Sequence, residues 1–328
     1  MPIGFNRFDR KTPVWGVGGP WPLLGAGAHR VHCAALFAPV DKMMLTFIAF
    51  LALVAVYVHP GSLHFLVLLG IMAATFVAAA FWDRHSALGR VTHAFLPLPI
   101  VVTIFNVAGP LIGALNPLRF DETMAALDAS WFGPLVPAWR QLLGRPDWLT
   151  DGASLAYVSY YFIPFGMCIA LWVQGRWKDF DDLGFGLITT LLLSYIGYFL
   201  VPTTGPRVPH ELELQVLGGG TFSARVRDFL RAAEVNQLDA FPSGHTALSL
   251  VYLGYGWRLY PTWKIRIPLA ISVVGIIFAT VYLSLHYAVD LVAGALLALA
   301  VPMAVRGLRR IFGEGGTAQA LPVRPEPG

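Results

Sequence analysis

Eight apolar stretches, each about long enough to cross a lipid bilayer, constrain the fold of this sequence more than any other feature. They lie near residues 44–59, 63–82, 94–116, 152–174, 183–201, 242–257, 267–284 and 286–305. Because lipid offers the backbone no hydrogen-bond partners, such stretches fold as α-helices. With 56% hydrophobic and 13% charged residues, the chain also has too little polar surface for a soluble globule. We therefore predict an all-α integral membrane protein with about eight transmembrane helices.

These stretches divide the chain into five parts. They are a cytoplasmic tail at 1–43, N-terminal transmembrane helices at 44–116, an extracytoplasmic interfacial loop at 117–151, a catalytic transmembrane core at 152–305 and a second tail at 306–328. The first part is rich in Gly and Pro and has no helical period, which is typical of a disordered segment. Alternatively, the true start lies nearer Met43. No signal peptide precedes the first apolar stretch, which we interpret as a retained anchor.

The distribution of positive charge predicts an orientation. If the N-terminus is cytoplasmic, sixteen of the 23 Lys and Arg residues lie on the cytoplasmic side. The other seven fall in two long outer loops, where the positive-inside bias is weaker. We therefore expect both termini in the cytoplasm, in a bacterial inner membrane. The net charge of +4 is dispersed rather than clustered, so no nucleic-acid partner is expected.

Two short phrases carry the chemistry. Phe241-Pro242-Ser243-Gly244-His245 opens one apolar stretch, and His286 with Asp290 opens another. The spacing of four places His286 and Asp290 on one helix face. In the predicted topology, these groups and Arg207 all lie near the extracytoplasmic face. The plainer interpretation is that such residues only cross-link helices, but four polar groups at one depth favour a functional site.

These residues suit phosphoryl transfer, which requires a nucleophile, an acid for the leaving group and donors for the phosphate oxygens. His286 is the candidate nucleophile, Asp290 the group that orients its ring, and His245 the acid. Ser243 and Gly244 lie at a helix start, where backbone N–H groups and the helix dipole favour an anion. Arg207 offers a guanidinium fork for phosphate.

A metal site is the alternative use of these groups, since two histidines and a carboxylate are a common ligand set. Arg207 and the helix start favour an anion at the same place, so we expect neither a metal nor another cofactor. Cys33 and Cys168 are the only cysteines. One lies in the N-terminal tail and the other in the predicted helix at 152–174, so neither a disulfide framework nor a thiolate metal site is expected.

Pro242-Ser243-Gly244-His245 and His286-x-x-x-Asp290-x-x-x-Gly294 resemble the second and third signature motifs of the type 2 phosphatidic acid phosphatase superfamily. The resemblance covers roughly residues 150 to 305 and implies a six-helix catalytic core that acts through a phosphohistidine without metal. It assigns the nucleophile to His286, the acid to His245 and its orienting partner to Asp290. Phosphate binding falls to Arg207, Ser243 and Gly244.

Three positions depart from the phosphatase pattern. Leu200 stands where the first motif has lysine, Val208 follows Arg207 in place of proline, and Thr280 replaces an arginine six residues before the nucleophile. The pattern is similar to the branch that contains the fungal inositol phosphorylceramide synthases. That branch moves phosphoinositol between lipids, and a diester donor with one negative charge needs fewer cations than a monoester.

Two outer loops flank these motifs. The loop at 117–151 is expected to form a pair of short interfacial helices with solvated carboxylates. The alternative is that Asp121 or Asp128 contacts a lipid headgroup. The segment 222–235 in the second loop is either an amphipathic cap or a solvated face. Four tyrosines in the core could bind an inositol or ceramide hydroxyl, or could serve in packing. They are Tyr160, Tyr161, Tyr195 and Tyr198.

The sequence therefore predicts a membrane phosphotransferase that moves a phospho-headgroup, with phosphoinositol as one candidate, from a phospholipid donor to a lipid alcohol, a polyol or water. A lipid phosphate or undecaprenyl diphosphate phosphatase is the alternative within the same superfamily. A proton-coupled transporter is the alternative from another class. A transporter should show inverted repeats and polar residues near the midplane, whereas the sequence has no clear repeat and its polar cluster lies near one face.

Overall fold

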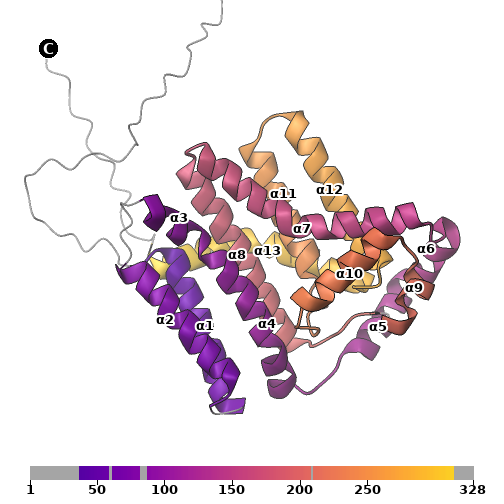
Figure 1. Cartoon of the computed structure of the whole chain (residues 1–328), viewed down its shortest axis with the longest axis horizontal. Helices are drawn as coiled ribbons and strands as arrows, with labels where there is room; N and C mark the ends of the chain where they lie inside the picture. The colour runs from indigo at the N-terminus through magenta and orange to yellow at the C-terminus, as the bar shows by residue number, and fades with distance from the viewer. Residues whose placement is uncertain (1–36, 59–60, 82–86, 208–209, 314–328) are drawn as a thin grey trace, which may run out of the picture. The chain divides into compact units, whose positions relative to one another are not determined.

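The computed structural model describes residues 37–58, 61–81, 87–207 and 210–313, all within one compact unit, Leu36–Gly328. Every regular element in these ranges is a helix (Figure 1). The helices are α1 Pro39–Val58, α2 Leu63–Phe81, α3 Ala87–Phe95, α4 Pro97–Leu115, α5 Asp121–Phe132, α6 Leu135–Leu143, α7 Asp147–Val173, α8 Trp177–Leu200, α9 His210–Leu217, α10 Thr221–Ala233, α11 Gly244–Leu259, α12 Trp263–Tyr282 and α13 Ala288–Phe312. The predicted tails lie largely outside the described residues.

In the part of the chain that the structure describes, six helical runs are long and apolar enough to cross a membrane, as expected of an integral membrane protein. They are α1, the run Val91–Leu115 from α3 into α4, α7, α8, α12 and α13. The other two predicted spans are shorter: α2 is apolar over Leu63–Ala78, and α11 has 16 residues. At 1.5 Å per residue, α11 covers about 24 Å, less than the roughly 30 Å hydrocarbon core. The count of eight therefore stays a prediction.

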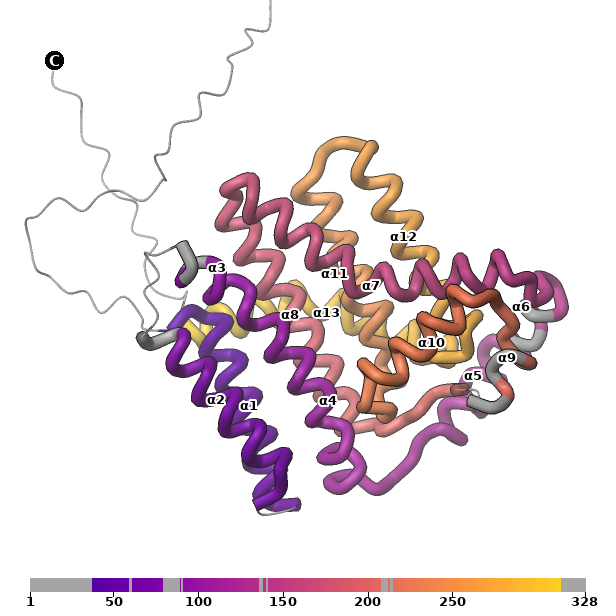
Figure 2. Tube along the Cα trace, viewed as in Figure 1, coloured from indigo at the N-terminus to yellow at the C-terminus, as the bar shows by residue number. Residues whose placement is uncertain are grey.

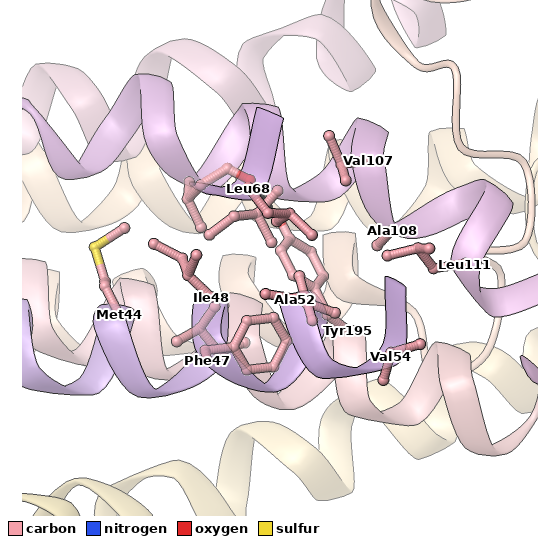
Figure 3. Packing of buried hydrophobic residues seen from close by; sticks show 14 of the residues in the cluster. Met44, Phe47, Ile48, Ala52, Val54, Leu68, Val107, Ala108, Leu111 and Tyr195 are labelled. Atoms are coloured by element: carbon pink, nitrogen blue, oxygen red, sulfur yellow. Dashed lines mark hydrogen bonds between the residues drawn. The ribbon is translucent and has the colours of Figure 1, made fainter. Parts of the chain in front are cut away.

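Helix α8 lies at the centre of the helical arrangement and packs against α1, α4, α7, α11 and α13 (Figure 2). One apolar cluster joins α8 to α1, α2 and α4, and a second joins α8 to α7, α11 and α12. Figure 3 shows Tyr195 of α8 among Phe47, Ile48 and Ala52 of α1 in the first cluster. Its hydroxyl donates to the Val101 carbonyl of α4 at 3.2 Å. Tyr195 therefore serves in packing, which was one of the two expected uses of the core tyrosines.

Several helices extend beyond the predicted apolar stretches. Helix α1 begins at Pro39 because the Asp41 carboxylate accepts the Ala38 N–H at 2.8 Å and so caps the first turn. Helix α7 begins at Asp147 rather than near 152, and α13 continues to Phe312 rather than ending near 305. Hydropathy follows the lipid-facing part of a helix, so it misses turns that continue into polar residues.

The third predicted stretch is divided at Leu96, where α3 ends and α4 begins with Pro97. Pro110 lies inside α4 without ending it. At Gly109 the helix comes close to the loop before α11, because a Cβ there would lie 2.9 Å from Oδ1 of Asn236. The third stretch therefore has its break before Pro97, and Gly109 is a point of close contact with the loop at Asn236.

The two outer loops contain short helices. The expected pair in the first loop is α5 and α6, and the second loop contains α9 and α10. Val226 and Leu230 of α10 join a buried cluster with Ala153 and Tyr157 of α7. One face of α10 is therefore packed on α7, which agrees with an amphipathic cap better than with a solvated helix.

Candidate active site

The turn between α12 and α13 holds His286. The carbonyl of Thr280 accepts two hydrogen bonds, from the N–H of Leu285 at 2.9 Å and from the N–H of His286 at 3.0 Å. These two bonds close the C-terminal end of α12. Ser284 has φ +59°, the left-handed conformation that this kind of helix end requires. The His286 side chain is only 3% exposed. The turn therefore delivers the histidine into the interior at the start of α13.

The His286 ring is oriented by a backbone carbonyl. Its Nδ1 lies 2.9 Å from the carbonyl oxygen of Ala240 and 3.5 Å from Oδ2 of Asp290. A carbonyl oxygen only accepts, so the Ala240 bond requires the proton on Nδ1 and leaves the lone pair on Nε2. Asp290 was expected to be the orienting partner, but its Oδ2 accepts the Tyr287 N–H at 2.8 Å and is the more distant neighbour of the ring.

His245 faces the free nitrogen of His286. Its Nδ1 lies 3.3 Å from His286 Nε2, and the two ring centroids are 5.5 Å apart. The rings of Tyr157 and Tyr160, with centroids 4.6 Å and 4.3 Å away, flank His245. Its other nitrogen, Nε2, is buried and has no partner among the described residues. The structure thus brings the histidines of the two motifs into direct contact.

The start of α11 is tied to α13. Ser243 is the N-cap of α11, and its hydroxyl accepts the Thr246 N–H at 3.2 Å. The Ser243 N–H itself donates to the Asp290 carbonyl at 3.0 Å. The donors that the helix start offers to an anion are therefore the first-turn N–H groups of Gly244 and His245, which have no intrahelical acceptor. Ser243 aligns the two helices instead.

Arg207 is paired with a carboxylate of the loop before α11. Its Nη2 is 2.6 Å from Oδ1 of Asp239, and its Nε is buried without a partner among the described residues. Burial by itself would lower the pKa of Arg207, but the charges of Asp239 and Glu234 outweigh burial and raise it. The guanidinium therefore remains charged, and its positive charge acts on His245. Among the described residues, Nε is thus a donor of this guanidinium that remains unpaired.

A family model described as the PAP2 superfamily matches residues 122–304, more than half of the chain, and includes His245, His286 and Asp290. The chain belongs to the PAP2 superfamily. Neither the search of curated proteins nor the search of solved structures gave a match. Membership confirms the expected superfamily and implies phosphatase or phosphotransferase activity on lipids, whereas it leaves the branch within the superfamily open.

In this PAP2 protein, two carboxylates of α5 hold the loops of the site. Asp121 Oδ1 accepts the N–H groups of Thr204 and Gly205 at 2.8 Å and 3.0 Å, and the Thr204 hydroxyl at 2.9 Å. Asp128 Oδ1 accepts the Val289 N–H at 3.0 Å, one residue before Asp290. The prediction of solvated carboxylates at these positions was wrong. These contacts join residues 83 and 161 positions apart, and no local pattern predicts them.

The remaining tyrosines and the cysteine have separate places in this PAP2 fold. The hydroxyls of Tyr157 and Tyr161 both donate to Glu234. The Tyr198 hydroxyl lies close to Gly244, because a Cβ at Gly244 would be 2.5 Å from it. Gly244 is thus required at the start of α11. Cys168 is a free thiol, and no three His, Cys, Asp or Glu side chains within the described ranges form a metal-binding group.

Proposed function

We propose that the protein moves a phospho-headgroup between lipids through a phosphohistidine on His286. The observation that carries this proposal is the 3.3 Å contact between His286 Nε2 and His245 Nδ1, with the opposite nitrogen of His286 held by the Ala240 carbonyl. A nucleophile with a fixed tautomer and an acid on the side of its reactive atom are the two groups that such a transfer requires.

The reaction proceeds in two displacements. In the first, His286 Nε2 forms a bond to phosphorus, the bond from phosphorus to the leaving oxygen breaks, and His245 gives that oxygen a proton. In the second, an acceptor hydroxyl gives its proton to His245, its oxygen bonds to phosphorus, and the P–N bond breaks. Asp290, fully buried beside the ring, stabilises the positive charge on His286 between the steps. Arg207 and the first N–H groups of α11 bind the phosphate oxygens.

Burial and charge favour a transferase that uses a diester donor. His286 and His245 are 3% and 9% exposed, so the reacting atoms are shielded from water, which competes with an alcohol acceptor. Arg207 supplies the positive charge of the proposed site, and the negative charges of Asp239 and Glu234 offset part of it. A diester has one negative charge where a monoester has close to two. The phosphoinositol headgroup of the resembling branch is one such donor.

The proposed placement has eight membrane crossings with the site at the extracytoplasmic face of a bacterial inner membrane. Positive side chains gather at the helix ends remote from the histidines. Asp182 pairs there with Arg309 at 3.0 Å and with Arg258 at 3.4 Å, and Lys42 donates to the Phe312 carbonyl at 2.7 Å. Such a concentration supports a cytoplasmic location for that end. Labelling of single cysteines at either end with a membrane-impermeant thiol reagent tests this placement.

Thr280 tests the preference for a diester. The side chain is fully buried, and its hydroxyl donates to the Ile277 carbonyl at 2.7 Å. We expect the native enzyme to turn over a phosphodiester lipid faster than the matching monoester, and Thr280→Arg to shift this ratio toward the monoester by about 1–2 kcal/mol, the size of one charge-assisted hydrogen bond. Competition assays with both lipids measure the shift.

Thr280→Met is the control for this prediction, since it adds length without charge. The ratio should shift with arginine and not with methionine, while the thermal midpoint in detergent reports any damage from overpacking. A native preference for phosphatidic acid or another monoester would contradict the transferase proposal and favour a phosphatase.

Metal chelation and vanadate test the covalent mechanism from another side. Because the phosphate partners proposed here are Arg207 and backbone N–H groups, we expect activity to survive a chelator. Vanadate should inhibit, since it adopts the five-coordinate geometry of the phosphorus transition state. Loss of activity in chelator that a divalent ion restores would favour a metal mechanism instead.

A further inference from the structure

His245 is held differently from the other groups of the site. The His286 ring is fixed by the Ala240 carbonyl at 2.9 Å, and Asp290 by the Tyr287 N–H at 2.8 Å. Among the described residues, the His245 ring has a hydrogen-bond contact with His286 alone, the residue that becomes phosphorylated in the proposed reaction. Within the described ranges, its Nε2 has no partner. The orientation of His245 therefore depends on the aromatic rings that pack against it.

Those rings belong to consecutive turns of α7. Tyr157 and Tyr160 lie on His245 with centroid separations of 4.6 Å and 4.3 Å, at interplanar angles of 33° and 43°. Tyr161 meets Tyr160 edge-on, with centroids 5.1 Å apart at 81°. These tyrosine rings can hold the His245 ring in place only if the tyrosines are themselves fixed.

Glu234 fixes the outer edge of this group. Its Oε1 accepts the hydroxyl of Tyr157 at 3.2 Å and also the hydroxyl of Tyr161. One carboxylate oxygen therefore joins two of the three tyrosines directly and reaches Tyr160 through its contact with Tyr161. Burial, followed by the neighbouring charge of Asp239, raises the pKa of Glu234, so the two phenol donors are its main support as an anion together with the charge of Arg207.

Glu234 is itself anchored from two sides. It is the C-cap residue of α10, and its N–H donates to the Leu230 carbonyl at 2.8 Å. The next N–H, that of Val235, donates to the Asn106 side chain of α4 at 3.0 Å. Leu230 in turn packs into the cluster that contains Tyr157. The end of α10 is thus a fixed point between α4 and α7, on a helix that the proposed mechanism does not otherwise use.

We propose that Glu234 is a positioning residue for His245, acting through the hydroxyls of Tyr157 and Tyr161. This inference rests on the proposed role of His245 as the acid. It assigns a catalytic purpose to α10: the helix carries the carboxylate that keeps the tyrosine rings, and so the proton-donating histidine, in line with the leaving oxygen. Through these rings, the loss of Glu234 should lower turnover more than substrate binding. Its charge also acts on Arg207, and Glu234→Gln, which removes the charge and keeps an oxygen acceptor, separates the two effects.

The test is a double-mutant cycle on the full-length protein in detergent or vesicles, with turnover of a fluorescent phospholipid as the assay. Glu234→Leu removes the acceptor, and Tyr157→Phe removes one hydroxyl but keeps the ring. We expect Tyr157→Phe to lower kcat about tenfold, the effect of one lost hydrogen bond, and Glu234→Leu, which removes the acceptor of both Tyr157 and Tyr161, to lower it at least as much. KM should stay within about twofold of the native value in both variants. The double variant should lose little more than Glu234→Leu alone, because Glu234→Leu already breaks the hydrogen bond that Tyr157→Phe removes.

Three further variants make the result interpretable. Glu234→Gln keeps an oxygen acceptor without the charge, so it should retain most of the activity if the hydrogen bonds matter. Asp228→Leu is the matched control, because Asp228 is an exposed carboxylate of the same helix that pairs with Arg231. His245→Ala tests the foundation: full activity there would overturn the proposed function itself.

The outcomes separate the possibilities. Native kcat in Glu234→Leu, or additive losses in the double variant, would overturn the positioning role while leaving the function of His245 intact. A rise in KM with native kcat would overturn it in favour of direct substrate binding by Glu234. If Glu234→Leu does not fold, as judged by its thermal midpoint, Tyr157→Phe and Glu234→Gln decide the question by the same criteria.

Discussion

His286→Ala should abolish turnover and leave the protein folded and inserted in the membrane. The imidazole supplies the atom that bonds to phosphorus, and alanine offers no substitute. Removal of a covalent nucleophile typically costs about 10⁴-fold or more in kcat. The backbone of the turn does not need the ring, because the Thr280 carbonyl accepts two main-chain N–H groups there. Steady-state assays should therefore show background activity, and labelled donor should give no phosphorylated protein.

Two companion variants make this result specific. Asp290→Asn should be impaired less, by about 10²-fold, because the Ala240 carbonyl still fixes the His286 tautomer while the stabilising negative charge is lost. His64→Ala, on α2, removes a histidine that belongs to neither motif and should keep native activity. Substantial turnover by His286→Ala, or a phosphorylated histidine that persists in it, would contradict the covalent mechanism.

The two histidines and Asp290 could be predicted from sequence because each lies in a short local motif. The helix start exposes N–H groups near His245, as expected. His286 was expected on the same helix as Asp290, but it precedes Tyr287, the N-cap of α13, so the turn and not helix spacing places its ring 3.5 Å from Asp290. The partners that orient them could not be predicted. Ala240 contributes only a backbone carbonyl, which carries no residue-type signal, and Glu234 reaches Tyr157 across 77 positions. Asp121 likewise serves as a loop anchor through a contact that periodicity does not encode.

The all-helical fold followed from hydropathy for a related reason. A spanning helix satisfies its own backbone, so each apolar stretch can be interpreted by itself. Helix ends depend instead on caps and on neighbouring chains. Asp41 extends α1 to Pro39 through a cap, and the short length of α11 reflects a start fixed by Ser243 at the site. The N-cap at the candidate site thus sets where α11 begins and how long it is, and hydropathy cannot predict this.

The close contact of α13 with α11 at Gly294 leads to the second large prediction. A Cβ on Gly294 would lie 2.5 Å from the Ser243 carbonyl oxygen and 3.1 Å from the Thr246 Cβ. The nearest atom is backbone of the helix start that carries His245, so it cannot turn aside as a flexible side chain would. Gly294→Ala must therefore push α13, with Asp290, away from α11 and strain the bond from Ser243 N–H to the Asp290 carbonyl.

We expect Gly294→Ala to lower the stability of the protein by about 1–3 kcal/mol, the usual cost of overpacking. Turnover should fall by about 10²-fold, because a shift on the order of 1 Å between reacting groups has that effect. Gly307→Ala is the matched control: it lies on the same helix, and a Cβ there meets nothing within 4 Å. A helix-interior Gly→Ala change without a clash should be neutral or slightly stabilising, so both variants are compared by thermal midpoint and by kcat. Native turnover in Gly294→Ala would mean that the histidine pair tolerates displacement of α13, and the 3.3 Å contact between the rings would then not be the feature on which catalysis depends.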